Sequence, residues 1–472
     1  MAGSTAAFSV ADIVGMALVF LAIGWVSRRV ARRPNEFMVA ERRLTLFPLV
    51  ATLVMTEFNT STLLAFSAAG YRAGPMALAL PLVFLIGLGF YTLTVARAWK
   101  RFDRLSVAQL FTARYGPGLG RLASALLLLA MTGFSATYVK SLTLVVAPWL
   151  PGINHWWLSA ALVVVTLGVL LTGGLATVVR SDIVGFVLTL LVVALLLALG
   201  LTRHGGLSHL GSAFPAEQLA FAPWRQWQTP ALPFRFVLTL IVLTCFTYIT
   251  APWYGQKIFA ARDERTAFLA VGITAVLVFA LYGALVMAAA LFRLDDAALV
   301  DPQLVTPIMI QRWLPAGLRG VGLAMLCVAA LTTLAGVWSA MGTMLTADFQ
   351  LPGLARLTGM RTAIVIIAIA CWLGANLFVD DILDRLILAN IPVAALAFAL
   401  LAGFHWPRAT RAGAWASVVV GVTWGVGCYV LVGEAGGYTW PWAMYGIPLI
   451  MVTGVVVSLM TAAGVRERSN SS

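Results

Sequence analysis

Apolar stretches, each about as long as a membrane-spanning helix, recur from one end of this chain to the other. A transmembrane helix needs about 20 mostly apolar residues, whereas a membrane β-barrel shows shorter segments of alternating polarity. The stretches are bounded by charged residues, proline and glycine, and they predict an all-α polytopic membrane protein. We expect about thirteen spans, at residues 9–27, 45–70, 75–98, 121–147, 155–172, 182–201, 234–255, 267–292, 319–345, 361–379, 382–403, 413–432 and 440–464.

The composition excludes a water-soluble fold. Of the 472 residues, 61% are hydrophobic and only 10% are charged, against about 25% charged residues in ordinary soluble domains. We assign the net charge of +13 to basic cytoplasmic loops rather than to a nucleic-acid surface, because such loops fix membrane topology. Most Lys and Arg residues, including those between Arg28 and Arg33, face the cytoplasm if the N-terminus lies outside and the C-terminus inside, and we expect this orientation.

The sequence indicates neither a metal centre nor an enzyme active site. The four cysteines lie inside apolar runs without a CxxC pair, and the four histidines are scattered along the chain. An enzyme needs a nucleophile, a base or metal ligands that converge on one place. The chain also has no GxxxxGK[ST] motif for ATP binding. We therefore expect no enzyme and no ATP-driven pump.

Glu57 is the most informative residue inside a predicted span. It lies near the middle of the second span, in the stretch TEFNTST, where a charge costs at least about 2.5–3.5 kcal/mol. The neighbouring Thr, Asn and Ser side chains compete with the backbone for hydrogen bonds, which favours a local break in the helix. Such breaks bind ions and solutes in transporters. The alternative is a glutamate that only bonds a neighbouring helix.

Thr332 and Thr333 form a pair of adjacent hydroxyls deep in the ninth predicted span. Successive helical residues point about 100° apart, so one hydroxyl can meet a cation together with nearby carbonyls, and the other can assist. Oxygen ligands suit a hard cation such as Na⁺. Threonine in a membrane helix also bonds back to its own helix, so the pair alone leaves both roles open.

Four segments resemble motifs of one family, the sodium:solute symporters, and they occur in the family's order. ERRLTLFPLVATLVMTEFNTSTLLAFSAAGYRAG is similar to its basic residue, unwound first core helix and closing G-Y-x-x-G. LTGGLATVVRSDIVGFVL is similar to GG-x-x-A-V-x-x-[TS]-D-x-x-Q, with Gly185 in place of Gln. APWYGQKIFAARDERTA is similar to Q-x-x-x-Q-R-x-x-A-A-[KR], with Lys257 in place of Arg and Pro252 where Gln is common. AALTTLAGVWSAMGTMLTADF is similar to A-A-x-M-S-[ST]-x-D-S, with Ala335 and Gly336 in place of Asp-Ser.

The resemblance covers roughly residues 10–465 and implies a LeuT-type fold in a single transmembrane transporter domain over residues 1–472. Its core would consist of two inverted repeats of five helices, at 45–201 and 234–403. One extra helix would precede the core at 9–27, and two would follow it at 413–464.

The resemblance also implies a sodium site between the broken first core helix and the eighth core helix. The ligands would be the carbonyls of Met55, Phe58 and Ala329 and the hydroxyls of Thr332 and Thr333.

Arg42 and Asp182 lie in two of these motifs, and we expect them to act in coupling or gating. Asp182 begins the sixth predicted span, where the helix dipole alone would favour an acid.

The resemblance makes Glu57 the residue that indicates the solute, because it falls between two of the implied sodium ligands. Sugar-transporting relatives tend to carry Asn there, and proline-transporting ones an acid. Glu57 could bind a substrate ammonium group, hold a second cation or tune the sodium site. Together with Asn59 and Thr62 it suggests an amine-bearing or other small polar metabolite, whose carboxylate end could face a half-helix N-terminus.

Two aromatic residues are expected at the solute site or the inner gate, Tyr248 and Trp253. For Trp253 the alternative is an anchor at the membrane interface. Segment 75–85, PMALALPLVFL, lacks the Glu and the hydroxyl that sugar transporters place in this helix. Hexose transport is therefore disfavoured.

The expected function is Na⁺-coupled uptake of a small organic solute by alternating access, in a multi-pass protein of a bacterial inner membrane. Sodium, the solute and membrane lipid are the expected partners, and nucleic acid is not. Two alternatives stay open: a proton-coupled symporter of the same fold that uses Glu57, and a solute sensor that does not transport.

Overall fold

The computed structural model describes residues 9–27, 42–150, 152–219, 222–349 and 357–470. The regular elements within these ranges are helices, and one isolated bridge pairs Leu44 with Ala261. The all-α prediction is therefore confirmed. The basic run between Arg28 and Arg33, on which the predicted orientation partly depends, lies outside the described residues.

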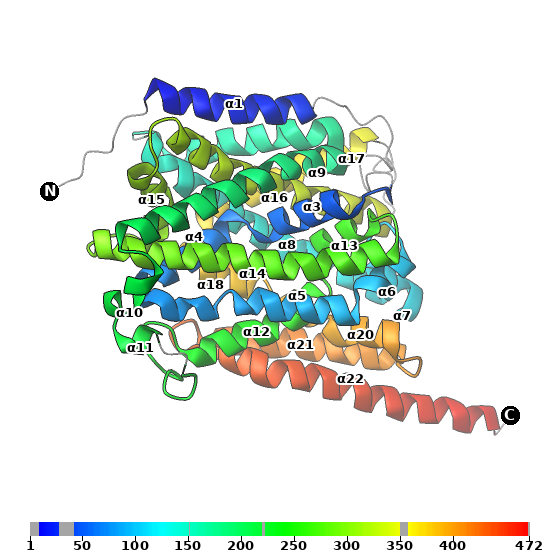
Figure 1. Ribbon diagram of the computed structural model, residues 1–472. Coiled ribbons are helices and arrows are strands. Elements are labelled where there is room, and N and C mark those ends of the chain that lie inside the picture. Colours follow the sequence, from blue (N-terminus) through cyan, green and yellow to red (C-terminus); the bar gives the residue numbers. More distant parts are fainter. Residues whose placement is uncertain (1–8, 28–41, 151, 220–221, 350–356, 471–472) are drawn as a thin grey trace.

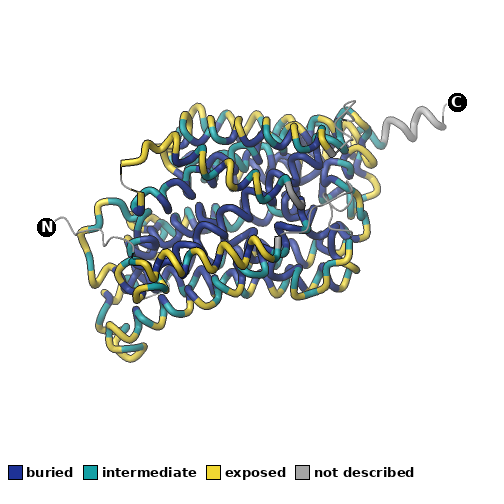
Figure 2. The backbone as a smooth tube through the Cα atoms, turned by 90° about the horizontal axis from the view of Figure 1, so that it is seen from above, coloured by how far each residue is buried: buried dark blue, intermediate teal, exposed yellow. Residues whose placement is uncertain are grey.

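Long helices lie side by side along a common direction (Figure 1). Buried residues follow their inner faces and exposed residues their outer faces (Figure 2). The longer helices are α1 (Val10–Ser27), α3 (Leu46–Glu57), α4 (Thr60–Ala73), α5 (Leu82–Thr94), α8 (Pro117–Val146), α9 (His155–Arg203), α12 (Phe234–Tyr248), α14 (Glu264–Asp295), α16 (Leu318–Phe349), α17 (Leu357–Leu377), α21 (Arg411–Val432) and α22 (Thr439–Asn470).

Shorter helices connect or extend the long ones. They are η2 (Gly74–Ala79), α6 (Ala96–Phe102), α7 (Gln109–Tyr115), η3 (Ala147–Trp149), η4 (Leu207–His209), α10 (Leu210–Ala213), α11 (Ala216–Leu219), α13 (Pro252–Phe259), η5 (Pro302–Leu304), α15 (Val305–Trp313), α18 (Ile382–Leu388), α19 (Ile391–Ala394) and α20 (Ala397–His405).

Four of the candidate spans are bent at a short break. The bend is 61° between α3 and α4, 48° between α5 and α6, 48° between α12 and α13, and 44° between α18–α19 and α20. Seven helices are long and apolar enough to cross a membrane alone, or up to eleven spans if each bent pair is one, within the described ranges. Two shorter apolar helices, Val10–Val26 and His155–Leu171, add to these. The count of thirteen stays a prediction.

The most extensive helix contacts divide the core into two groups. In the α14 group, α14 packs on α3, α4 and α5, and α12 packs on α5. In the α16 group, α16 packs on α8 and α9, and α17 packs on α8. The two groups meet where α3 and α14 contact α9. Helix α16 lies at the centre, since 94% of the residues in its most apolar stretch are buried.

One end of the bundle, which we call the basic end, carries α6, α7 and several ion pairs. Arg42 contacts Asp103 at 3.0 Å, and Arg101 contacts Glu264 at 2.8 Å. Helix α22 ends on this side of the molecule, whereas α1 begins at the opposite end (Figure 1). That arrangement agrees with termini on opposite sides of a membrane, while the side that faces the cytoplasm stays a prediction.

Candidate functional site

The predicted break in the second span is present between α3 and α4, and Asn59 holds it open. Phe58 leaves helical geometry with ψ 59°, and Asn59 is extended with ψ 157°. The Asn59 side-chain amide donates to the Glu57 carbonyl at 3.1 Å, and its oxygen accepts the Thr62 backbone N–H at 2.9 Å. One side chain therefore satisfies a backbone group on each side of the break, as helix ends require.

Oxygen atoms from α3 and α16 converge at this break. The Thr333 hydroxyl lies 3.0 Å from the Met55 carbonyl and 2.7 Å from the Ala329 carbonyl, although it can donate only one proton. The Thr332 hydroxyl is buried and has no hydrogen-bond partner in the described part of the chain. Phe58, the fifth expected ligand, is fully buried at the helix end, where carbonyls lose their helical partners. These oxygens suit a hard monovalent cation.

Glu57 is 1% exposed, and its groups bind the α14 group. Its Oε2 accepts the Tyr248 hydroxyl at 2.5 Å, and its backbone carbonyl accepts the Tyr282 hydroxyl at 2.6 Å. Its other carboxylate oxygen, Oε1, is buried without a hydrogen-bond partner among the described residues. A buried carboxylate with one unpaired oxygen is costly unless a cation or a donor arrives. Glu57 Oε1 is therefore an acceptor that a cation or a donor could pair with.

A central cavity of about 90 Å³ lies next to this glutamate. Its described lining consists of uncharged residues: aromatic and aliphatic side chains, with threonines and two asparagines. The lining comprises Asn59, Thr62, Phe66, Val83, Phe84, Phe134, Tyr138, Leu240, Leu243, Thr244, Thr247, Tyr248, Trp253, Leu383, Leu386, Ile387 and Asn390.

Four of the five expected solute residues line the central cavity, and the fifth, Glu57, contacts it through Tyr248. Trp253 is 8% exposed and packs edge-on against Phe134, with ring centroids 5.1 Å apart. Its position in the cavity wall favours a part in the solute site or the inner gate over an anchor at the membrane interface, and its role stays a prediction.

Asp182 is not at a helix start, so the dipole explanation is wrong. Helix α9 is interrupted at Gly174, with φ 57° and ψ −147°, and its second part begins there rather than at residue 182. Asp182 therefore lies two turns inside the helix and is 1% exposed. Its Oδ2 lies 3.3 Å from the Lys257 ammonium and accepts the Thr52 hydroxyl.

Arg42 lies at the basic end, apart from these contacts. It adopts a left-handed backbone, with φ 59°, and pairs with Asp103 on the loop after α6. The structure thus brings Asp182 to Thr52 in the middle of α3 and places Arg42 in a different ion pair.

Sequence reasoning missed three residues of the site. Lys257 was noted only as a replacement for Arg in a motif, and its contacts on α3 lie about 200 positions away. Tyr282 lies in an apolar helix without a local signal. Asn390 precedes Pro392 in the last of the four bent spans, between α18 and α19, and an asparagine at such a break is the signal that was available.

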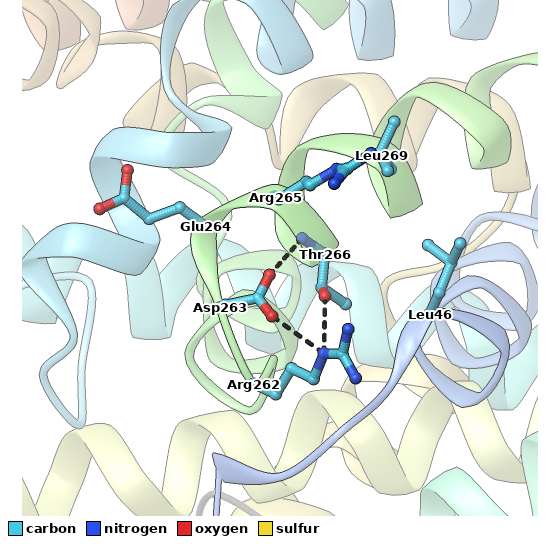
Figure 3. A pocket seen from close by; sticks show the side chains of 7 residues that line it. All are labelled: Leu46, Arg262, Asp263, Glu264, Arg265, Thr266 and Leu269. Carbon is cyan, nitrogen blue, oxygen red and sulfur yellow. Dashed lines mark hydrogen bonds and ion pairs between the residues drawn. The ribbon is translucent and has the colours of Figure 1, made fainter.

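A larger hollow of about 650 Å³ lies at the surface of the basic end (Figure 3). Asp263 caps α14 there, accepting the Thr266 N–H at 2.7 Å, and also pairs with Arg262 at 2.9 Å. These contacts, the Thr266 backbone N–H first, hold the pKa of Asp263 below its usual range. Arg262 and Asp263 pair with one another, and Glu264 pairs with Arg101 on α6, so these three charges are explained as contacts of a helix start rather than of a binding site.

Comparison with known proteins gave one family and several structures. A family model described as the sodium:solute symporter family matches residues 37–421. The fold is similar to that of a Na⁺-coupled sialic acid symporter in a substrate-bound, outward-open state, with a TM-score of 0.76 and 15% identity over 95% of this chain and 97% of that one. A manganese transporter of Eremococcus coleocola has a TM-score of 0.49 and 13% identity over 92% of this chain and 97% of that one. The search of curated proteins found no match.

Proposed function

The chain belongs to the sodium:solute symporter family, and from this premise we propose that it takes up a small amine-bearing solute with sodium by alternating access. As a member of this family it is a multi-pass transporter, not an enzyme, and Na⁺ is its coupling ion. The identity of the solute, the sodium ligands and the topology are the parts that we propose.

The sodium ion is proposed to bind between α3 and α16. Its ligands are the carbonyls of Met55, Phe58 and Ala329 and the hydroxyls of Thr332 and Thr333. The observation that carries this assignment is the Thr333 hydroxyl within 3.0 Å of two carbonyls from different helices. The neighbouring Thr332 hydroxyl lacks a partner among the described residues, as a ligand group would before a cation binds.

Replacing both hydroxyls tests this site. In proteoliposomes, the double variant T332A/T333A should lose sodium-driven uptake. The matched control is T346A on the same helix, whose hydroxyl bonds carbonyls of its own helix at 3.1 and 2.9 Å; it should keep sodium activation. Unchanged sodium activation in the double variant would refute the site.

The central cavity supports a small solute with a positive amine. Its volume of about 90 Å³ is well below the roughly 300–1,000 Å³ of common ligand pockets, which disfavours sugars as large as a hexose. Its aromatic walls can hold an ammonium group by cation–π contacts. We assign that ammonium to Glu57 Oε1. A carboxylate on the same solute would meet the N-terminus of α4, where the helix dipole is positive.

A thermal-shift screen with and without Na⁺ identifies the solute class. Amino acids, monocarboxylates, sialic acids and vitamins form the panel, and we expect stabilisation by small amines only. E57Q should abolish that shift while leaving the shift produced by Na⁺ alone. Sodium activation lost together with amine binding would instead assign Glu57 to the sodium site. Uptake driven by a pH gradient without sodium would support the proton-coupled alternative.

We also propose the predicted topology. Residues 45–201 and 234–403 form the inverted repeats, and support comes from a broken first helix in each, α3–α4 and α12–α13. The N-terminus lies outside a bacterial inner membrane. A reporter fused between Arg28 and Arg33 should be cytoplasmic, and a reporter exposed to the outside would refute this orientation.

A further inference from the structure

A positive charge of the protein itself is buried next to the proposed sodium site. The Lys257 side chain is 2% exposed and that of Asp182 is 1% exposed. The Lys257 ammonium donates to the Thr52 carbonyl at 2.9 Å, to Asp182 Oδ2 at 3.3 Å and to the Thr56 hydroxyl. An ammonium group has three N–H donors, so all three are satisfied by oxygens of α3 and α9.

The atoms around this ammonium are those that bind metal cations. A backbone carbonyl, a hydroxyl and a carboxylate are hard oxygen ligands of the kind that bind sodium or calcium. The second carboxylate oxygen, Asp182 Oδ1, is buried and lacks a hydrogen-bond partner within the described ranges. A carboxylate buried in this way needs a positive charge beside it. Lys257 supplies that charge from α13.

The ammonium and the sodium site are direct neighbours. Thr56, which accepts from Lys257, follows Met55, whose carbonyl is a proposed sodium ligand. On the α16 side, a Cβ atom at Gly336 would lie 3.8 Å from the Lys257 nitrogen. Position 336 is one helical turn beyond Thr332, so the two cations would lie about a turn apart. With the Lys257 ammonium and one sodium ion that close together, a second sodium ion cannot bind beside them.

We propose that the Lys257 ammonium occupies a second cation site, formed by Thr52, Thr56 and Asp182, so that one sodium ion instead of two is bound in each transport cycle. This inference rests on the sodium site of the proposed function. It assigns Asp182 the role of ligand to a tethered cation. Removal of the lysine side chain should open the site to a second sodium ion.

Direct counting of bound sodium tests the proposal without knowledge of the solute. Purified full-length protein is titrated with ²²Na⁺ in choline chloride, and bound ions per chain are counted. The wild type should bind one ion, K257A two, and the double variant K257A/D182N one, because it lacks the carboxylate. K257R keeps the charge and should bind one ion. Thermal stability of K257A should fall without sodium and recover with NaCl, but not with choline chloride.

The outcomes separate this inference from the proposed function. Two ions bound by the wild type would overturn the inference and leave sodium coupling intact. One ion bound by K257A would also overturn it, whatever the effect of NaCl on the thermal stability of that variant. T332A/T333A should bind none, and adding K257A to it should restore one ion. Full binding by T332A/T333A would overturn the proposed sodium site, and with it this inference.

Discussion

At the scale of single residues, the site depends on one carboxylate that is only half satisfied. Glu57 Oε2 accepts the Tyr248 hydroxyl, while Oε1 has no hydrogen-bond partner in the part of the chain that the structure describes. The tyrosine also lines the central cavity. In the proposed function, Tyr248 orients the carboxylate so that Oε1 stays available to the solute. The cavity supplies aromatic surface, and Glu57 supplies charge.

Tyr248→Phe should therefore weaken amine binding without removing the charge. A hydrogen bond to a charged group contributes about 1.5–3 kcal/mol, and we expect roughly a tenfold or greater rise in the Kd of the amine found in the screen. Calorimetric titration measures it. Tyr254 is the matched control, because its ring packs against that of Tyr248 and its buried hydroxyl has no partner among the described residues. An equal loss of affinity in Y254F would contradict the role given to the Tyr248 hydroxyl.

Residue patterns revealed the parts of the site that are unusual for a membrane span. Glu57, the hydroxyls around it and the Thr332–Thr333 pair are polar groups in apolar runs. Because burying such groups in a membrane is costly, their presence indicates a function. Lys257 was not recognised as functional, although it too is charged. Its partners Thr52 and Asp182 lie on two other helices, 205 and 75 positions away. Only the folded chain shows that the ammonium of this lysine is surrounded by oxygen atoms of α3 and α9.

At the scale of elements, the break between α3 and α4 is stabilised by its own N-cap residue, Asn59. Predicting it needed only local information, because Thr, Asn and Ser in one short stretch disfavour a continuous helix. The start of the sixth span could not be predicted in the same way. An arginine and a serine before Asp182 looked like the end of a loop, whereas the helix continues from Gly174 and buries them partly or fully.

Asn59→Ala should loosen the break and thereby weaken sodium binding. The variant loses both the cap on α4 and the donor to the Glu57 carbonyl, and loss of a cap costs about 0.5–2 kcal/mol. The carbonyls of Met55 and Phe58 on the other side of the break would then be less ordered. We expect a lower melting temperature and at least a fivefold weaker apparent affinity for Na⁺, measured by thermal shift.

Asn154 provides the matched control for that prediction. It caps α9 through the Trp156 N–H at 2.8 Å, at an exposed helix start away from the central cavity. N154A should lower the melting temperature by a similar amount and leave the apparent sodium affinity unchanged. If both variants lose sodium affinity equally, the effect comes from general destabilisation, and the cap at the break has no special part in ion binding.

At the scale of the whole molecule, the cation positions join the two helix groups. Met55 on α3 meets Thr333 on α16. Thr52 on α3 donates to Asp182 on α9, which also pairs with Lys257. Ligands from both groups bind a cation best in one relative position of the groups. If sodium binds at the proposed site, it favours that position, as reciprocal coupling between binding and conformation requires. The tethered ammonium would keep the α9 contact in place when sodium leaves.

The hydroxyls of Ser61 on α4 and Ser141 on α8 offer a test of relative motion between the groups. They lie 3.0 Å apart and are fully buried, so cysteines at both positions should form a disulfide, which holds Cβ atoms about 3.5–4.5 Å apart. If α4 moves against α8 in each cycle, oxidation of the variant S61C/S141C should reduce uptake at least tenfold, and dithiothreitol should restore it. Sodium binding should persist.

Each single cysteine variant is a control, and mass spectrometry verifies the crosslink. The four native cysteines are free and buried. Full uptake with the crosslink formed would show that these two helices do not separate during transport.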